Sequence, residues 1–469
     1  MLVFRQLRHC TFLLALGSCA LVLPAWSAAP KLVVTHARLF TMVNGQEKPL
    51  TGYLIVAADG SLSHVGEGSP PADAVLGATE TWDAQGKWIL PGFISAHSHL
   101  WQSAYRGLAY DQTLMGWVRA VYEQNAILAD PENFYWFTLH GALDHLRHGI
   151  TGVYNFNFSW TQTQGKFLSE QQFRAERDSG IRFVHGINIG RISAEWTVEQ
   201  ASAFTGDFLA WVRAQPHTPG FLSVMINGAG AFVGSPDQAK AEGELMRQFK
   251  IGNQSHFLES PPDKYEERAK FRWLKDAGLL GPNLIFGHFV HTDPWILKET
   301  VLSGTSMSWN PLSNGRLASG IVDIPTYRKA GLRIGMGVDG QASADRADPF
   351  ENMRMGLYQV RAHYEDASVL SPYDVLRMHT VGSADVLGVA DRLGSLAPGK
   401  LADFLVLDPS DLGPVFDPYA SLVFVAGTSD LVRVYVGGEL KVIDGQPIGP
   451  AFAQTRAEVA RRVKTPDVR

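Results

Sequence analysis

Hydrophobic and polar residues alternate in short runs at both ends of the chain, whereas longer apolar runs fill its middle. Residues 28–90 include GYLIVAADGSLSHVGEG, in which alternating positions surround an Asp59-Gly60 turn, and this pattern predicts a β-hairpin. Residues 398–450 include LADFLVLD and VRVYVGGELKVIDGQ, which predict further strands. The economical interpretation is a small β-sandwich domain built from both chain ends, with the middle inserted as a second domain.

The middle of the chain, residues 91–397, alternates β-like runs with helical patterns. The β-like runs are ILPGFISAH, GITGVYNF, IRFVHGI, FLSVMIN, NQSHFL, NLIFGH, TSMSWN and RIGMGVD, and helix-like stretches separate most of them. Eight β/α units over about 300 residues predict an α/β fold, a (β/α)8 TIM-like barrel. An open doubly wound sheet is the alternative, but no glycine-rich phosphate loop follows the first strand. Residues 451–469 carry charges at helical spacing and predict a C-terminal surface helix.

The first residues have the pattern of an export signal. Positively charged positions precede an apolar stretch at 10–23, and small residues then flank Trp26. We expect residues 1–27 to be a signal peptide cleaved after Ser27, which places the mature protein in the periplasm or outside the cell. The alternatives are a retained anchor and a lipoprotein attached at Cys19. No other run is long enough for a transmembrane helix, so no stable membrane insertion is expected after cleavage.

Composition narrows the classes of function. Hydrophobic residues make up 45% and charged residues 19% of the chain, which is typical of a packed globular protein. The net charge of -5 argues against nucleic-acid binding, which needs a basic face. The two cysteines, Cys10 and Cys19, lie in the predicted signal, so the mature chain would have no thiolate nucleophile or metal ligand. We expect a small-molecule substrate, and a homo-oligomer is left open.

Side chains that can bind a metal or move a proton stand at the ends of four predicted strands. In a barrel, the carboxyl ends of the strands meet at one mouth, where active sites lie. Residues two apart on a strand point to the same side, so the histidines of a His-x-His pair can share one ion. The residues in question are His97, His99, His256, Glu259, His288, His291 and Asp339.

Four of these groups form a plausible ligand set. His97, His99, His256 and Asp339 offer three neutral nitrogens and one hard oxygen, which suits Zn²⁺, or Fe²⁺ and Mn²⁺, with a position left for water. Each residue taken alone has a simpler interpretation, such as a core histidine or a turn at Asp339-Gly340. Their order and spacing along a barrel favour the metal site.

Five sequence motifs around these residues resemble those of a known family. PGFISAHSHL (91–100), HFLES (256–260), GHFVH (287–291), NPLSN (310–314) and GVDG (337–340) resemble the amidohydrolase superfamily. The similar branch is that of the cytosine, guanine and adenosylhomocysteine deaminases and the triazine hydrolases. LGSLAPGKLADFLVLD also resembles the segment that leads from the barrel back into the β-domain. The resemblance covers nearly all of the chain after the signal.

The resemblance implies one divalent metal ion per chain, most simply zinc, bound by His97, His99, His256 and Asp339. Binuclear members of the superfamily use a carboxylated lysine late in the fourth strand. The stretch FLSVMINGAGAF (221–232) has no lysine, so a mononuclear site is expected.

The resemblance also implies catalytic roles. A bound cation lowers the pKa of water towards neutrality and so supplies hydroxide. Asp339 would accept the proton of that water, and His288 would orient the hydroxide. Glu259 would protonate the leaving nitrogen. His291 is expected to be structural.

Four residues are predicted to bind the substrate. Gln102 matches a position that contacts substrate in some members, and Asn155 could read an amide-like edge. Trp101 and Trp309 would stack on a planar ring, although many relatives have histidine where Trp309 stands. Aromatic residues near the strand ends point to the same kind of ligand; they are Trp101, Tyr105, Trp117, Phe156, Phe158, Trp160 and Trp309.

The predicted function is therefore an exported metal-dependent amidohydrolase that hydrolyses a non-peptide C–N bond of a small heterocyclic or aryl substrate. Deamination and amide hydrolysis use the same groups and stay open. Release of halide or alkylamine from a heterocycle is an alternative. A non-catalytic small-molecule-binding protein on the same fold is the alternative from another class.

Overall fold

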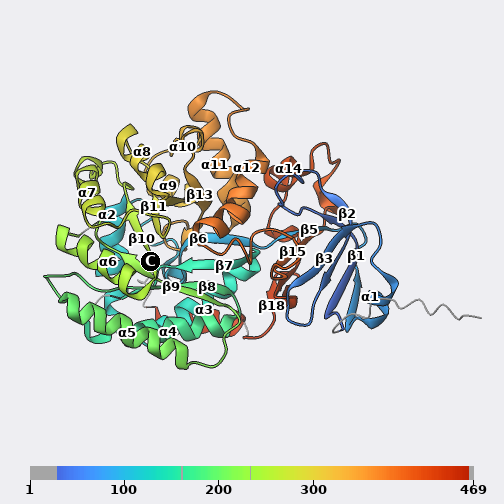
Figure 1. Ribbon diagram of the computed structural model, residues 1–469, viewed down its shortest axis with the longest axis horizontal. Helices are drawn as coiled ribbons and strands as arrows, with labels where there is room; N and C mark the ends of the chain where they lie inside the picture. The colour runs from blue at the N-terminus through green and yellow to red at the C-terminus, as the bar shows by residue number, and fades with distance from the viewer. Residues whose placement is uncertain (1–28, 160–161, 233, 451, 464–469) are drawn as a thin grey trace, which may run out of the picture.

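The computed structural model describes residues 29–159, 162–232, 234–450 and 452–463. The predicted signal peptide and Trp160 lie outside the described residues. Two parts are distinguishable in Figure 1: a barrel surrounded by helices, and a β-sheet that stands beside it. No helix in the described ranges is both long and apolar enough to cross a membrane.

Strands from both ends of the chain form one sheet of nine strands, in the order β18-β17-β16-β15-β5-β1-β2-β3, with β4 paired to β1. The two halves join where β5 and β15 pair antiparallel, with Leu90 opposite Leu405. The described residues give this single sheet, so the prediction of a β-sandwich is not confirmed. The strands are β1 (Leu32–Leu39), β2 (Leu50–Val56), β3 (Leu62–Glu67), β4 (Glu80–Asp83), β5 (Trp88–Pro91), β15 (Phe404–Leu407), β16 (Leu431–Val436), β17 (Glu439–Ile443) and β18 (Gln446–Pro447).

Alternating apolar positions give this sheet its buried face. Val34, Leu54 and Ile89 are fully buried, and the rings of Phe404 and Tyr435 stack with centroids 4.4 Å apart. Between β2 and β3 the chain turns at Gly60, whose φ of 83° suits glycine.

The second sheet is parallel and belongs to the barrel, with the order β13-β12-β11-β10-β9-β8-β7-β6-β14. Helices separate the successive strands from β6 to β13 and surround the sheet (Figure 1). In chain order the elements are β6 (Phe93–His99), α3 (Asn133–Arg147), β7 (Ile150–Asn155), α4 (Gln162–Ser179), β8 (Arg182–Ile187), α5 (Val198–Ala214), β9 (Phe221–Gly228), α6 (Pro236–Phe249), β10 (Gly252–Phe257), α7 (Lys264–Asp276), β11 (Leu284–His288), α8 (Pro294–Ser303), β12 (Ser306–Trp309), α10 (Ile324–Ala330), β13 (Arg333–Met336), β14 (Asp339–Gly340) and α11 (Pro349–Tyr364).

The last strand of this sheet meets the first. Only Gly337 and Val338 separate β13, which pairs with β12, from β14, which pairs with β6. The Val338 N–H donates to Ser95 Oγ at 3.0 Å and holds this connection against β6. A Cβ at Gly337 would lie 2.7 Å from His97 O, so the close approach requires glycine. The sheet therefore curls round on itself, and the domain is an α/β TIM-like domain.

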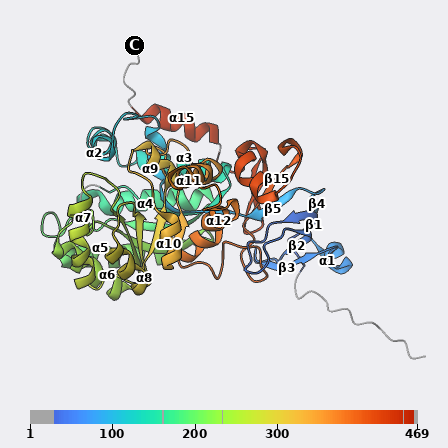
Figure 2. The same ribbon diagram turned by 90° about the horizontal axis from the view of Figure 1, so that it is seen from above.

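Shorter helices fill the connections, and the C-terminal helix α15 lies along α3 (Figure 2). In α15 the ring of Phe452 stacks on His140 with centroids 5.0 Å apart, and Thr455 and Val459 are buried. The remaining helices are α1 (Ala72–Gly77), η1 (Leu100–Tyr105), α2 (Leu114–Val118), η2 (Arg119–Glu123), η3 (Ala126–Leu128), α9 (Pro311–Arg316), α12 (Pro372–Arg377), η4 (Met378–Gly382), α13 (Ser383–Val386), η5 (Ser410–Leu412), α14 (Pro418–Ala420), η6 (Ser421–Val425), η7 (Thr428–Asp430) and α15 (Phe452–Arg462).

Candidate metal centre and active site

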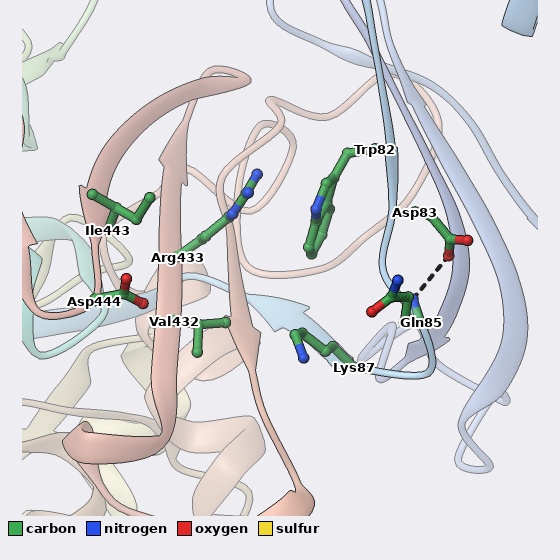
Figure 3. Close-up of a pocket in the computed structure, with 8 residues that line it drawn as sticks. All are labelled: Trp82, Asp83, Gln85, Lys87, Val432, Arg433, Ile443 and Asp444. Atoms are coloured by element: carbon green, nitrogen blue, oxygen red, sulfur yellow. Dashed lines mark hydrogen bonds between the residues drawn. The ribbon is translucent and has the colours of Figure 1, made fainter.

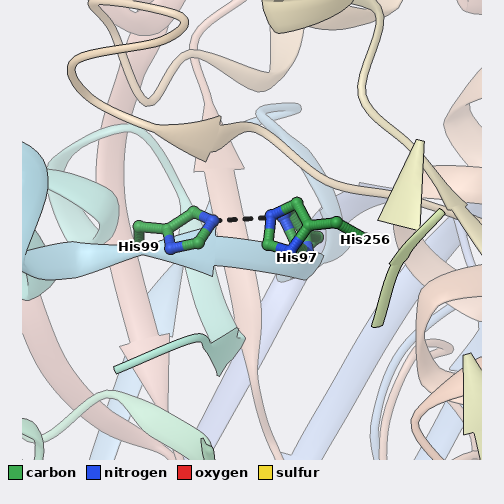
Figure 4. Close-up of side chains that lie close together, drawn as sticks. All are labelled: His97, His99 and His256. Carbon is green, nitrogen blue, oxygen red and sulfur yellow. Dashed lines mark hydrogen bonds between the residues drawn. The ribbon is translucent and has the colours of Figure 1, made fainter. Parts of the chain in front are cut away.

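The four predicted metal ligands converge where β6 and β10 end and β14 begins. His97 Nε2 lies 3.2 Å from His99 Nε2, and both nitrogens lie 3.3 Å from Asp339 Oδ1. The His256 ring comes from the opposite side of the barrel, with its centroid 4.7 Å from that of His97. Figure 4 shows the three imidazoles turned towards one another. The geometry thus brings together three nitrogens and a carboxylate.

Hydrogen bonds on the far sides of two rings show which nitrogens face the centre. The His97 Nδ1–H donates to Gln254 Oε1, and the His99 Nδ1–H donates to Phe156 O at 3.1 Å. In a neutral imidazole the other nitrogen, Nε2, then carries a lone pair. Two lone pairs and a carboxylate oxygen facing one another repel unless a cation lies between them. The donor set of this centre therefore fits a divalent metal ion.

The electrostatics of the cluster favour the protonation states that a metal requires. Burial lowers the pKa of His99 to about 3, and burial also lowers the pKa of His256 well below its usual value. Burial acts in the opposite sense on Asp339, but its close contacts with the neighbouring histidines outweigh burial and keep the pKa of this carboxyl well below its usual value. Neutral imidazoles beside a carboxylate are the forms that bind metal.

His288 and Glu259 lie beside the ligand set. His288 Nε2 is 3.6 Å from Glu259 Oε2 and 3.8 Å from Asp339 Oδ2, and its Nδ1–H donates to Asn314 Oδ1 at 2.8 Å. Burial, together with the charge of Asp339, raises the pKa of Glu259 to about 8. This carboxyl can therefore carry a proton at neutral pH, as a general acid must.

The backbone is strained where these side chains leave their strands. Leu258, His288 and Asp339 have φ values of 56°, 69° and 57°, in the left-handed region that non-glycine residues avoid. Side-chain contacts hold two of these turns: the Glu267 carboxylate accepts the Leu258 N–H, and Ser343 Oγ donates to Asp339 Oδ2 at 2.9 Å. The strained residues are therefore those that set the direction of the Glu259, His288 and Asp339 side chains.

Two of the predicted substrate-binding residues lie close to this centre. Gln102 and Trp101 belong to η1, which begins directly after His99. Gln102 contacts the backbone of Gly340, because a Cβ there would lie 1.7 Å from Gln102 Oε1. Gln102 Oε1 and Trp101 Nε1 are both buried without a hydrogen-bond partner in the described structure.

The other two are engaged elsewhere. Asn155 accepts the Leu100 N–H at 3.0 Å and donates to Glu176 at 2.5 Å, so its amide serves the protein itself. Trp309 lies on the outer side of β12 against α11, where a Cβ at Gly356 would meet its ring at 2.5 Å. The geometry does not bring these two side chains to the metal centre.

The remaining aromatic residues of the prediction divide into two groups. Tyr105, Trp117 and Phe158 pack with Trp101 in one cluster above the barrel. Phe156 contacts the ligands directly, with its ring centroid 5.1 Å from His99 and 4.7 Å from His256. Phe156 therefore forms an aromatic wall beside the ligands, whereas the cluster around Trp101 is packed within the fold.

Sequence reasoning missed three residues near the centre. Gln254 stands two residues before His256, so the strand period alone places it on the same side of β10. Asn314 lies in the NPLSN motif, yet nothing in the sequence links it to His288. Tyr122 belongs to an irregular segment without periodicity, so no sequence signal points to it.

Histidines that the sequence left without a chemical role are bound within the fold. His145 Nδ1 donates to Gly141 O at 2.7 Å, His148 Nδ1 to Asp144 O at 2.7 Å, and His291 Nε2 to Ser319 O at 2.6 Å. These bonds are consistent with structural roles.

Two surface cavities lie away from the metal centre. One, of about 490 Å³, lies on the nine-stranded mixed sheet between Trp82 and Arg433 (Figure 3). The other, of about 670 Å³, lies beside Leu332 and Ile334, at the start of β13 and so at the other end of the barrel. Cavity volume therefore does not mark the reactive groups, since Glu259 and His288 are themselves only 2% and 1% exposed.

Comparison with known proteins places the chain in a family. Residues 88–441 match the model of the amidohydrolase family. The chain belongs to this family, and it is a hydrolase that acts on C–N bonds other than peptide bonds.

Named relatives match the predicted branch. The chain is 28% identical over 421 residues to a 5-methylthioadenosine/S-adenosylhomocysteine deaminase of Symbiobacterium thermophilum, covering 87% of this chain and 93% of that one. It is 28% identical to hydroxydechloroatrazine ethylaminohydrolase of a Pseudomonas species, covering 76% and 79%.

Solved structures share the fold. An adenosine deaminase of Xanthomonas campestris with bound zinc has a TM-score of 0.80 at 23% identity, covering 92% of this chain and 97% of that one. Atrazine chlorohydrolase of Arthrobacter aurescens, complexed with zinc, also has a TM-score of 0.80, at 22% identity, covering 92% and 100%.

Proposed function

We propose that this amidohydrolase deaminates a small, neutral aminoheterocycle with one metal ion per chain. The observation that carries the proposal is the pairing of two features: a set of acceptor atoms that faces inward, and a buried Glu259 whose pKa is raised to about 8. Such a pair supplies both a metal site and a proton for a leaving nitrogen.

Zinc is the ion that we propose. Three imidazole nitrogens with one carboxylate oxygen is a common zinc ligand set, and the two zinc-containing structures above share the fold. A single ion is supported by β9, because Asn227 at its end bonds to Tyr154 and Asn157 and no lysine is present.

The chemistry follows from the positions of the side chains. A bound metal supplies a Lewis acid that lowers the pKa of water. His288 Nε2, with its Nδ1–H held by Asn314, can only accept a hydrogen bond, so it orients the attacking water. Asp339 Oδ2, 3.8 Å from His288 Nε2, can accept the proton of that water. Glu259 then donates its proton to the leaving nitrogen, which departs as neutral ammonia.

The aromatic wall supports a planar substrate. The Phe156 ring, which contacts His99 and His256, favours flat, weakly charged ligands. No arginine or lysine lies within three residues of a metal ligand in the sequence, which disfavours phosphorylated substrates. The names of the relatives favour loss of ammonia, and hydroxydechloroatrazine ethylaminohydrolase makes release of an alkylamine the second candidate.

The test is a substrate panel on the purified protein, metal-free and after addition of zinc. It contains guanine, adenine, 5'-deoxyadenosine, hydroxydechloroatrazine, an aryl amide, a dipeptide and a nucleotide, with ammonia and amine release measured. We expect zinc-dependent ammonia release from an aminoheterocycle. Turnover confined to the dipeptide or the nucleotide would overturn the proposal, and elemental analysis showing two ions per chain would overturn the single-ion site.

We also propose that the chain works after export. The support is the charged and apolar pattern of residues 1–27 and the lack of cysteine after Cys19. Fractionation of the native host with N-terminal sequencing should find a mature chain that begins near Ala28 outside the cytoplasm. An intact Met1 on a cytoplasmic form would contradict this, and a lipid on Cys19 would identify the lipoprotein form. A homo-oligomer stays a prediction that light scattering can test.

A further inference from the structure

Tyr122 reaches the active site from a segment that no motif marks. It lies in η2, a single π-helical turn between η1 and α3, and such turns are frequent at functional sites. Three rings hold its own ring in place, with centroid distances of 5.0 Å to Trp101, 5.8 Å to Trp117 and 6.0 Å to Phe158. Trp117 is fixed in turn, because its Nε1–H donates to Ala342 O at 2.7 Å. The position of the Tyr122 hydroxyl is therefore set by packing.

The Tyr122 hydroxyl contacts Gln102. Gln102 Nε2 donates to Tyr122 Oη at 3.4 Å. This is the one hydrogen bond that the described structure gives the Gln102 side chain, since Oε1 is buried without a partner. Oε1 lies against Gly340, next to the ligand Asp339. An amide group is planar, so a bond that fixes the nitrogen on one side also fixes the oxygen on the other.

We propose that Tyr122 is a positioning residue of the substrate site, which holds the Gln102 amide so that Oε1 accepts an N–H of the substrate ring. This inference rests on the proposed function and adds a preference to it. Rings that carry an N–H at the edge facing Gln102 are favoured over rings in which that nitrogen is methylated. When the ring nitrogen is methylated, Gln102 Oε1 stays buried without a hydrogen bond in the complex, and this weakens binding. A ring N–H supplies the missing hydrogen bond.

Tyr122 does not act as an acid or base in this role. Burial, together with the charges of Asp339 and Glu259, raises the pKa of its phenol above the ordinary value. The hydroxyl therefore stays protonated across the working pH range. Removing it should change which ring is preferred, and it should leave the shape of the pH–rate profile unchanged.

The test compares lactam substrates with their N-methyl analogues: guanine with 1-methylguanine, and isocytosine with 3-methylisocytosine. The pair is used whose parent compound the zinc-loaded enzyme turns over. We expect the wild type to prefer the parent and Tyr122→Phe to reduce that preference about tenfold, the value of roughly one hydrogen bond. Zinc content and Tm should not change.

Two further variants separate this role from a packing role. Tyr105→Phe removes a hydroxyl from another tyrosine of the same aromatic cluster, with its ring 6.0 Å from Trp101, and it should keep the wild-type preference. Gln102→Leu should lose the preference for the parent compound. Adding Tyr122→Phe to Gln102→Leu should not change the preference further, since the tyrosine acts through the glutamine.

The outcomes distinguish this inference from the proposed function. If neither guanine nor isocytosine is turned over or bound, this inference fails; it fails alone when the zinc-loaded enzyme releases ammonia from another aminoheterocycle of the panel, and the proposed function fails with it when no aminoheterocycle releases ammonia. If ammonia is released but Tyr122→Phe discriminates as the wild type does, the positioning role alone is overturned. The same holds if Tyr122→Phe removes one limb of the pH–rate profile, because the hydroxyl would then move a proton.

Discussion

Two buried clusters of histidine and carboxylate lie in neighbouring parts of the barrel, and their hydrogen bonds differ in kind. In one, Glu176 of α4 accepts from His185 at 2.7 Å and from Asn155 at 2.5 Å, so donors meet acceptors. In the other, His97 and His99 turn their Nε2 atoms towards Asp339 and towards each other, so acceptors meet acceptors. Both clusters are buried, and each contains histidine and one carboxylate.

The difference shows how a structural cluster can be told from a metal site. A cluster whose polar atoms pair among themselves stabilises the fold alone. A cluster of inward-facing lone pairs, with the outer nitrogens bound to Gln254 and Phe156, is completed by a cation. The predictions below test this distinction, beginning with the largest effect.

His97→Ala should lose most of the metal and nearly all activity, because three ligands rarely hold an ion that four hold. Elemental analysis and ammonia release measure both. The control is His140→Ala, a buried histidine of α3 that stacks on Phe452 and should keep the metal. Full metal content in His97→Ala would contradict the ligand assignment.

Glu259→Gln should lower kcat about 10²–10⁴-fold, the usual size of general acid–base catalysis, with metal content unchanged. Steady-state kinetics on the substrate found in the panel measures this. Glu351→Gln, a change on the exposed side of α11, should have no effect. Loss of metal from Glu259→Gln would make Glu259 a ligand.

Glu176→Leu should lower the free energy of unfolding by about 3–5 kcal/mol, because it leaves a buried histidine and an amide without their acceptor. Metal per folded molecule should not change. Urea unfolding measures the free energy of unfolding, and elemental analysis measures the metal content. Glu170→Leu on the same helix breaks only a pair with Arg174 near the surface and should cost less than about 1 kcal/mol.

In the metal-free protein, Glu259 should reduce the stability as the pH rises from about 4.5 to about 8, whereas buried histidines such as His99, with a pKa lowered to about 3, act in the opposite sense. The folded-state pKa of Glu259, about 8, lies above the ordinary value of 4.5, so the folded state binds the extra proton and its ionisation costs stability. Glu259→Gln lacks this ionisable group, so between pH 4.5 and 8 the wild type should lose up to a few kcal/mol of stability relative to the variant. Urea unfolding at several pH values measures the difference, and parallel curves would contradict it.

Gln254→Leu should weaken zinc binding about 10–100-fold, because the His97 Nδ1–H loses its acceptor and the ring loses its fixed orientation. Competition with a chelator measures the affinity. Gln254→Glu keeps an acceptor oxygen and should bind more tightly than Gln254→Leu. Equal affinity in all three proteins would mean that Gln254 does not orient His97.

The sequence predicts the barrel and the ligand set because both depend on short-range rules. Strand ends and a period of two place His97 and His99 on one side of β6, and the same rule places Gln254 with His256. Trp309 shows the limit of that rule. The NPLSN motif places it near the site along the chain, but it packs outward on α11 at Gly356.

Other features depend on contacts between distant segments. The hydrogen bond that Gln102 donates to Tyr122 joins η1 to η2, and no local pattern predicts it. Asn155 illustrates the same limit. The sequence predicts that its amide binds the substrate, but the amide donates to Glu176, which lies on the distant helix α4.

The pairing of Asp339 with Ser98 closes the barrel and places the fourth ligand beside His97 and His99. Closure and site assembly are therefore one event, and it comes late, because every other strand of the barrel precedes β14 in the chain. Until then the histidines of β6 have no carboxylate partner, and a half-made chain has only an incomplete site for metal. We therefore expect complete metal binding only after all strands of the barrel have been synthesised and folded, in the compartment where folding ends.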